Sequence, residues 1–177
     1  FDHVGGIGDV PGAELFVSPE AWDVVRTAKH PERDYIPRSR ILIPGARWRL
    51  FDFASTDDAD LAPFSEAFDV MGDGSLMVVP TPGHSVGSVS MLIRSADSPP
   101  ILLIGDLSYS ADLLFANQTP GLGDQAVLLE SFAKVQAMKE NLPDLVLVAS
   151  PDMGAASKLE AAHAQALAAS PDRVAVS

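Results

Sequence analysis

His84 stands in the turn "TPGHSVGSVS", and Asp106 ends the apolar run "ILLIGD". A carboxylate at the end of a buried strand needs a partner, and a turn that only reverses the chain does not need a histidine. Near the start, Asp2 and His3 stand close to a glycine pair, which lets the backbone fold tightly around a site. Imidazoles and carboxylates are ligands that Zn²⁺ accepts without thiolates, and the chain has no cysteine. The set predicts metal chemistry, although each residue alone also suits a turn, a cap or a loop hydrogen bond.

The other two histidines have simpler interpretations. His163 lies in an alanine-rich helical segment whose one acidic neighbour at useful spacing is Glu160, so it is interpreted as a surface or interface residue. His30 precedes a proline at the end of a predicted helix, where its charge suits the helix dipole.

Composition narrows the class of protein. The chain has 177 residues, of which 47% are hydrophobic, and this predicts a packed domain. It contains no apolar run of the roughly 20 residues that a membrane span requires. The net charge of −12 argues against nucleic acid or an anionic membrane as a partner, because both would repel the surface. The lack of cysteine fits a cytoplasmic location, which we therefore expect.

Strands are predicted first in hairpins and later in alternation with helices. Helices are expected from Pro19 to about Lys29, after the cap Asp124 to about Asn141, and over 157–169. The middle helix carries one apolar stripe, formed by Leu128, Phe132, Val135, Met138 and Leu142. Strands are expected at 13–17, 48–53, 66–70, 75–80, 88–94, 101–106 and 145–149. Segments 31–47, 54–65 and 107–123 are expected to be irregular. Polar turns follow several strands, and strand ends are where α/β proteins build their sites.

The ordered set "FDHVGG", "TPGHSVGSVS", "LLIGDLSYS" and a late "SPD" resembles the metallo-β-lactamase superfamily, most of all its N-acyl-homoserine lactonase branch. The resemblance covers nearly the whole chain. It implies an α/β fold, namely the C-terminal portion of an αββα sandwich with a mixed sheet flanked by helices. Residues 1–177 are then expected to be a single domain that is incomplete at its N-terminus.

The resemblance also implies roles for individual residues. The family motif is His-x-His-x-Asp-His followed by a further His, a bridging Asp and a last His. By position, Asp2 and His3 match the motif's Asp and final His, His84 the further His, and Asp106 the bridging carboxylate. Tyr109 matches a tyrosine that hydrogen-bonds the substrate carbonyl or oxyanion, and Asp2 is placed to carry a proton to the leaving oxygen.

Two positions depart from the family pattern. The two leading histidines would fall before Phe1. The last histidine is replaced by Pro151, whose side chain cannot bind a metal, and the adjacent Asp152 is a potential substitute.

The resemblance implies a zinc-dependent hydrolase that opens lactones or cleaves related esters and acts in quorum quenching. It implies one or two zinc ions in the parent fold, and one or none in this chain. The expected partners are a small-molecule lactone or ester and either the missing N-terminal half or a second copy, with no nucleic acid and no membrane. The alternative is a degenerate, non-catalytic member of the fold that acts as a binding module.

Overall fold

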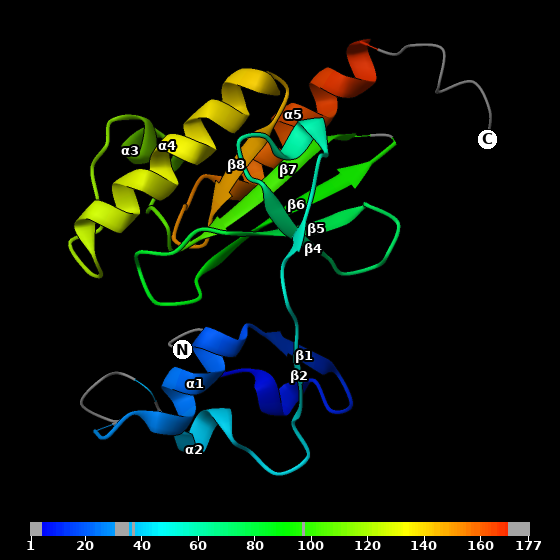
Figure 1. The fold of residues 1–177 in the computed structure, drawn as a ribbon. Coiled ribbons are helices and arrows are strands. Elements are labelled where there is room, and N and C mark those ends of the chain that lie inside the picture. Colours follow the sequence, from blue (N-terminus) through cyan, green and yellow to red (C-terminus); the bar gives the residue numbers. More distant parts are fainter. Residues whose placement is uncertain (1–4, 31–35, 37, 97, 170–177) are drawn as a thin grey trace. The chain divides into compact units, whose positions relative to one another are not determined.

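The computed structural model describes residues 5–30, 36, 38–96 and 98–169. The predicted ligands Asp2 and His3 therefore lie outside the described residues. The chain divides into two compact units, Phe1–Asp52 and Phe53–Ser177. Figure 1 labels most of the helices and strands of both units. The expectation of one domain over the whole chain stays a prediction.

The first unit contains two short parallel strands and two helices. Its elements are η1 (Ile7–Asp9), β1 (Glu14–Val17), α1 (Pro19–Thr27), α2 (Arg38–Ile41) and β2 (Arg47–Leu50). Helix α1 begins where the sequence predicts, because the Ser18 hydroxyl accepts a hydrogen bond from the Ala21 N–H at 3.2 Å. Pro19 occupies its first position, where the missing N–H leaves no helical hydrogen bond unmade.

A small apolar core joins the helices of this unit to β2. Val25, Ile36 and Ile41 are buried, and both tryptophans of the chain, Trp22 and Trp48, pack against them. The two indole rings lie with their centroids 5.4 Å apart. The Trp48 Nε1–H also donates to the Ile41 carbonyl at 3.2 Å. The tryptophan pair is therefore part of the structural core of residues 1–52.

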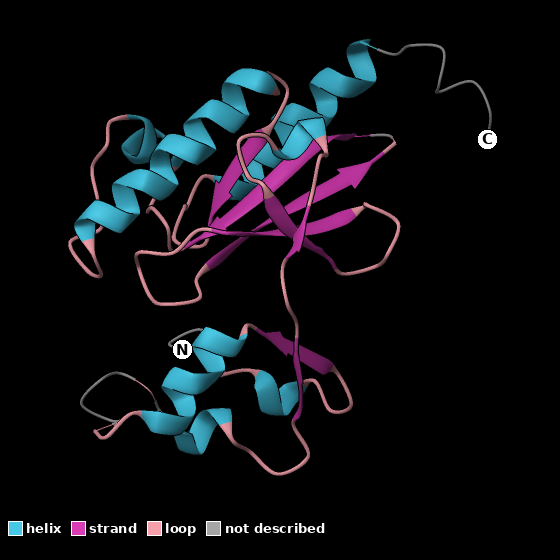
Figure 2. Ribbon diagram, viewed as in Figure 1, coloured by secondary structure: helices cyan, strands magenta, loops and turns pink. Residues whose placement is uncertain are grey.

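The second unit is built on a six-stranded mixed sheet, shown by its arrows in Figure 2. Its elements are β3 (Ala54–Ser55), η2 (Ala59–Leu61), β4 (Glu66–Asp69), β5 (Leu76–Pro80), β6 (Val89–Ser95), β7 (Ser98–Gly105), α3 (Ala111–Phe115), α4 (Gln125–Asn141), β8 (Val146–Ala149) and α5 (Ala155–Ala169). The strands follow the order β3-β4-β5-β6-β7-β8. All neighbours are antiparallel except β7 and β8, which are parallel. The start of β6 and the ends of β7 and β8 therefore lie at one edge of the sheet.

Helix α4 covers one face of this sheet with the predicted apolar stripe. Leu128, Phe132, Val135 and Met138 are each at most 1% exposed, and Leu142 packs against the same core. The sheet contributes residues that are paired in register across three adjacent strands: Leu92, Leu102 and Leu147. Helix α5 contacts β7 and β8. The fold class is thus confirmed as a mixed sheet flanked by helices. None of the described helices is long and apolar enough to cross a membrane.

The structure differs from the expected elements at several places. It adds to the helices and strands named above the short elements η1, α2, β3, η2 and α3. The expected strand at 48–53 is wrong at its end, since β2 stops at Leu50. Strand β7 begins at Ser98 and so includes two prolines that precede the strand expected at 101–106. These prolines are tolerated because the pairing of β7 with β8 begins only at Ile101, so no N–H is needed there on that side.

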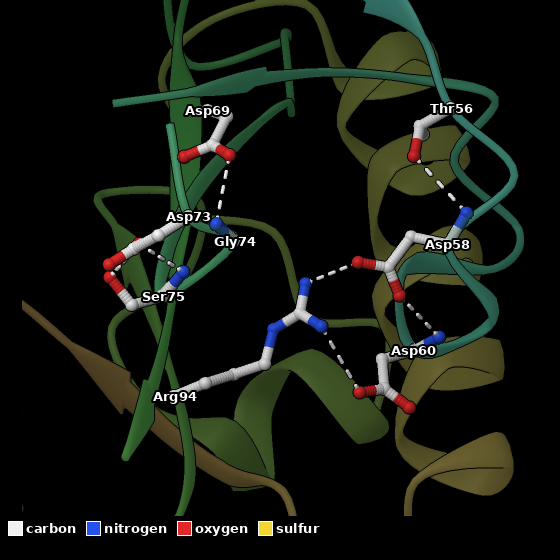
Figure 3. Close-up of polar contacts among 8 residues, drawn as sticks. All are labelled: Thr56, Asp58, Asp60, Asp69, Asp73, Gly74, Ser75 and Arg94. Atoms are coloured by element: carbon white, nitrogen blue, oxygen red, sulfur yellow. Dashed lines mark hydrogen bonds and ion pairs between the residues drawn. The ribbon is translucent and has the colours of Figure 1, made fainter. Parts of the chain in front are cut away.

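The acidic segment before β4 is tied to the sheet by Arg94 of β6 (Figure 3). The Arg94 Nη2 pairs with the Asp58 carboxylate, and its Nη1 lies 3.3 Å from the Asp60 Oδ2. The Asp58 Oδ1 also accepts a hydrogen bond from the Asp60 N–H at 3.1 Å and so caps η2. This part of the segment predicted to be an acidic loop is therefore a short helix fastened to β6.

Candidate metal site

His84 and Asp106 meet at the sheet edge defined above. His84 lies in the turn of residues 81–88 between β5 and β6, and Asp106 directly follows β7. The His84 Nε2 lies 3.8 Å from the Asp106 Oδ2, and the two side chains are 22% and 16% exposed. The structure therefore brings together two of the predicted ligands, which are 22 positions apart in the sequence.

The spacing of this pair is close to that of two ligands of one cation. At 3.8 Å the two atoms are farther apart than in a direct hydrogen bond, which spans about 2.7–3.2 Å. Two ligand atoms held tetrahedrally at about 2.1 Å from one zinc ion lie roughly 3.4 Å apart. An imidazole nitrogen and a carboxylate oxygen are donors that zinc accepts.

The pair alone does not complete a site. Within the described part of the chain, no group of three or more histidine, cysteine, aspartate or glutamate side chains is placed to hold a metal ion. Because zinc usually takes three or four protein ligands, a zinc ion bound by this pair would need further donors from outside these residues. The predicted donors Asp2 and His3 are in that category.

The turn that carries His84 is closed by its own polar groups. The Thr81 N–H donates to the Ser88 carbonyl at 3.0 Å. The Thr81 and Ser90 hydroxyls lie 2.9 Å apart, and both residues are at most 1% exposed. The Ser85 N–H donates to the Ser88 Oγ at 3.1 Å. These bonds fix the base of the turn against the start of β6.

Asp106 is placed by the sharp end of β7. Gly105 has a φ of +56°, which disfavours residues with a side chain. Its carbonyl accepts a hydrogen bond from the Ser150 N–H at 3.0 Å, which ties it to the end of β8. The Leu107 N–H donates to the Ile104 carbonyl at 3.1 Å, and the Leu107 side chain is 2% exposed. A buried anchor thus follows directly after the carboxylate.

Tyr109 lies between β7 and α3 and is 45% exposed. Its hydroxyl donates to the Pro120 carbonyl at 3.3 Å. That bond joins the loop before α3 to the loop between α3 and α4, and it is longer than the usual O–H···O hydrogen bond of about 2.5–3.0 Å. The predicted oxyanion role of Tyr109 stays a prediction.

The turn after β8 carries Pro151 and Asp152. The Asp152 Oδ1 accepts from the Gly154 N–H at 2.8 Å, and its Oδ2 lies 2.7 Å from the Lys158 Nζ. The Lys158 ammonium, and then the Gly154 N–H, hold the pKa of the Asp152 carboxyl below its ordinary 3.8. Both carboxylate oxygens are therefore used in fastening the start of α5, so Asp152 would have to break this pairing to replace the last motif histidine.

A comparison with known proteins identifies the family of this chain. The sequence profile of the metallo-beta-lactamase superfamily matches residues 1–147. The chain belongs to the metallo-beta-lactamase superfamily.

Relatives of this superfamily member include named lactonases. The N-acyl homoserine lactonase AttM of Agrobacterium fabrum is 32% identical over 120 residues, which are 68% of this chain and 42% of the relative. The N-acyl homoserine lactonase AttM of Azorhizobium caulinodans is 31% identical over 140 residues, 78% of this chain and 50% of the relative. A gamma-lactamase of Gibberella moniliformis is 33% identical over 119 residues, 62% of this chain and 46% of the relative. The chain thus spans about half the length of these relatives or less. The predicted resemblance to the lactonase branch is confirmed.

Solved structures confirm the superfamily fold. An N-acyl homoserine lactone hydrolase with the product N-hexanoyl-L-homoserine bound at its catalytic metal centre matches with a TM-score of 0.66 and 19% identity. The match covers 89% of this chain and 54% of that one. The dizinc quorum-quenching lactonase AidC matches with a TM-score of 0.59 and 19% identity, over 84% of this chain and 53% of that one.

The ligand positions predicted for this superfamily member fall into three groups. His84 and Asp106 lie together at the sheet edge. Asp2 and His3 lie outside the described residues. Pro151 provides no side-chain donor at the position predicted for the last motif histidine.

Proposed function

We propose that this chain carries part of the catalytic centre of a metal-dependent hydrolase that opens lactones or cleaves related esters. The observation that carries the proposal is the His84–Asp106 pair, 3.8 Å apart at one sheet edge. The names of the relatives support the reaction class. Because the chain spans about half the length of these relatives or less, their activity is assigned to this chain only as a proposal.

Each proposed ligand has a chemical reason. His84 offers the Nε2 lone pair, and Asp106 offers a carboxylate that can be shared. Asp2 and His3 would supply the remaining donors available in the chain. Zinc held here would lower the pKa of a water molecule and polarise the substrate carbonyl.

The reaction adds water across the bond between the acyl carbon and the ring oxygen. Oxygen from water attacks the carbonyl carbon, the carbon–oxygen bond breaks, and a proton is transferred to the leaving oxygen to give a hydroxy acid. In this scheme the Tyr109 hydroxyl leaves the Pro120 carbonyl and donates to the developing oxyanion. Asp2 carries the proton to the leaving oxygen.

The proposed substrate class is the N-acyl homoserine lactones and similar small lactones or esters, which would place the protein in quorum quenching. The named relatives are enzymes, and this favours a hydrolase over the non-catalytic binding module. Nucleic acid and membranes are not proposed as partners, because the net charge of −12 opposes both. Self-association and a cytoplasmic location stay predictions.

The first experiment measures zinc by elemental analysis of the purified protein, together with opening of a homoserine lactone followed by acid release. We expect about one equivalent of zinc, lost in His84→Ala and Asp106→Asn. His163→Ala is the matched control, because it removes an exposed histidine from α5. Zinc that is absent from the wild type, or unchanged in His84→Ala, would overturn the proposal.

A further inference from the structure

The His84 turn rests on the N-terminal end of α4, about 40 residues further along the chain. The Gly83 carbonyl accepts a hydrogen bond from the N–H of Asp124, the α4 N-cap, at 2.8 Å. The Ser131 Oγ donates to the Pro82 carbonyl at 2.7 Å, and Ser131 is 3% exposed. The two residues before His84 are therefore both bonded to this helix end.

The His84 turn and the start of α4 lie so close together that Gly83 and Gly123 have no room for a side chain. A Cβ built on Gly83, whose φ is +132°, would lie 2.7 Å from the Leu128 backbone nitrogen. A Cβ built on Gly123, whose φ is +87°, would lie 2.1 Å from the Gly83 carbonyl oxygen and 2.8 Å from the His84 Cα. Real Cβ contacts stay above 3.0 Å, so an alanine at position 123 would force a separation of about 0.9 Å.

The residues on the other side of His84 lie at the surface. Ser85 and Val86, which follow His84, are exposed. The long-range hydrogen bonds described above, from Ser131 and from the cap Asp124, connect the turn to α4. A displacement of this helix end would therefore also displace the backbone that carries the His84 imidazole.

We propose that Gly123 and Ser131 are positioning residues for His84. They fix the backbone on which its imidazole is mounted and hold its Nε2 opposite Asp106. This inference rests on the proposed function only where it concerns metal affinity. Metal ligands must be held within roughly 0.5 Å of their productive geometry, which is less than the separation that an alanine at 123 imposes.

Gly121 supplies a matched control for Gly123. Its φ is +78°, close to that of Gly123, so alanine meets a similar backbone strain at both positions. A Cβ on Gly121, however, would have nothing within 4 Å. A difference between the two alanine variants therefore reports the contact with the His84 turn and not the strain.

The test records the imidazole signals of His84 by nuclear magnetic resonance in metal-free protein and then measures the zinc Kd. We expect Gly123→Ala and Ser131→Ala to shift the His84 signals and to weaken zinc binding by about 10–100-fold, as loss of an outer-shell partner does. Gly121→Ala should leave both close to the wild type. Ser131→Ala also provides a test if Gly123→Ala does not fold.

The two readouts separate this inference from the proposed function. Shifted His84 signals in a protein that binds no zinc would support the positioning role and overturn the metal role. Unchanged signals and an unchanged zinc Kd in both Gly123→Ala and Ser131→Ala would overturn the positioning role and leave the metal role intact. Equal effects in Gly121→Ala and Gly123→Ala would also overturn it, because strain would then explain both.

Discussion

Replacing Arg94 by methionine tests whether the ion pairs in Figure 3 hold the segment before β4 on the sheet. The substitution keeps most of the aliphatic stem and removes the guanidinium that binds Asp58 and Asp60. It also leaves these two carboxylates close together without their cation. We expect the second unit to lose stability while its fold is retained.

The size of the loss follows from the burial of the pairs. Exposed ion pairs contribute about 0.2–1 kcal/mol, and removing one partner of a buried pair costs about 3–5 kcal/mol. The side chains of Arg94, Asp58 and Asp60 are 27%, 26% and 45% exposed, which lies between these cases. The Arg94 Nε is buried and has no hydrogen-bond partner among the described residues, so its removal offsets part of the cost. We expect a loss of about 1–2 kcal/mol in the free energy of unfolding.

The assay is urea unfolding followed by far-ultraviolet circular dichroism, to which the long helices α4 and α5 contribute strongly. With a slope of about 2 kcal/mol per M, the midpoint should fall by about 0.5–1 M. Arg94→Lys keeps the charge but not the planar fork, so its loss should be smaller. A cost below about 0.5 kcal/mol for Arg94→Met, the range of ordinary surface changes, would refute this reasoning. So would a lysine variant that is as damaging as methionine.

Three further substitutions test other contacts. Phe132→Ala empties the centre of the core and should cost about 3–5 kcal/mol of unfolding free energy in the same urea assay. Thr81→Val leaves the buried Ser90 hydroxyl without its partner and should cost about 1–3 kcal/mol, part of which the double variant with Ser90→Ala should recover; a double variant as unstable as the sum of both singles would contradict this. Lys158→Met should raise the pKa of Asp152 toward 3.8, as followed by a carboxyl titration in nuclear magnetic resonance. Because the folded-state pKa is depressed, the contribution of Asp152 to stability is present above pH 3.8 and is lost as the pH falls through the folded pKa, so the variant should show a weaker acid dependence; an unchanged titration would count against the ion pair.

The elements predicted best were those with strong local sequence signals, such as a helix cap or a helical period. Ser18 and Pro19 marked the start of α1, and the apolar stripe marked α4, because caps and a helical period are encoded within a few residues. The short elements α2 and α3 escaped prediction because four or five residues carry no period. Strand β7 extended through Pro99 and Pro100 because the relevant condition, a missing partner strand on one side, is a tertiary one.

Some residues of the candidate site could likewise be predicted from the sequence, and others could not. The positions of His84 and Asp106 at strand ends could be read from the sequence, and the antiparallel pairing of β6 and β7 explains why they meet. The involvement of Gly123 and Ser131 could not be read, because it depends on how the end of α4 docks on a turn about 40 residues away. A glycine before a helix cap is a common signal, and nothing local distinguishes Gly123 from Gly121.

The tryptophan pair in the first unit determines what optical probes can observe. Trp22 and Trp48 are the two tryptophans of the chain, and both belong to residues 1–52. Intrinsic indole fluorescence therefore reports the packing of that unit. It does not detect a separate unfolding of residues 53–177, which carry His84 and Asp106. Thermal melting followed in parallel by emission and by circular dichroism would reveal whether the two units unfold as one cooperative block: coincident curves indicate coupling, and separated curves indicate two independent transitions.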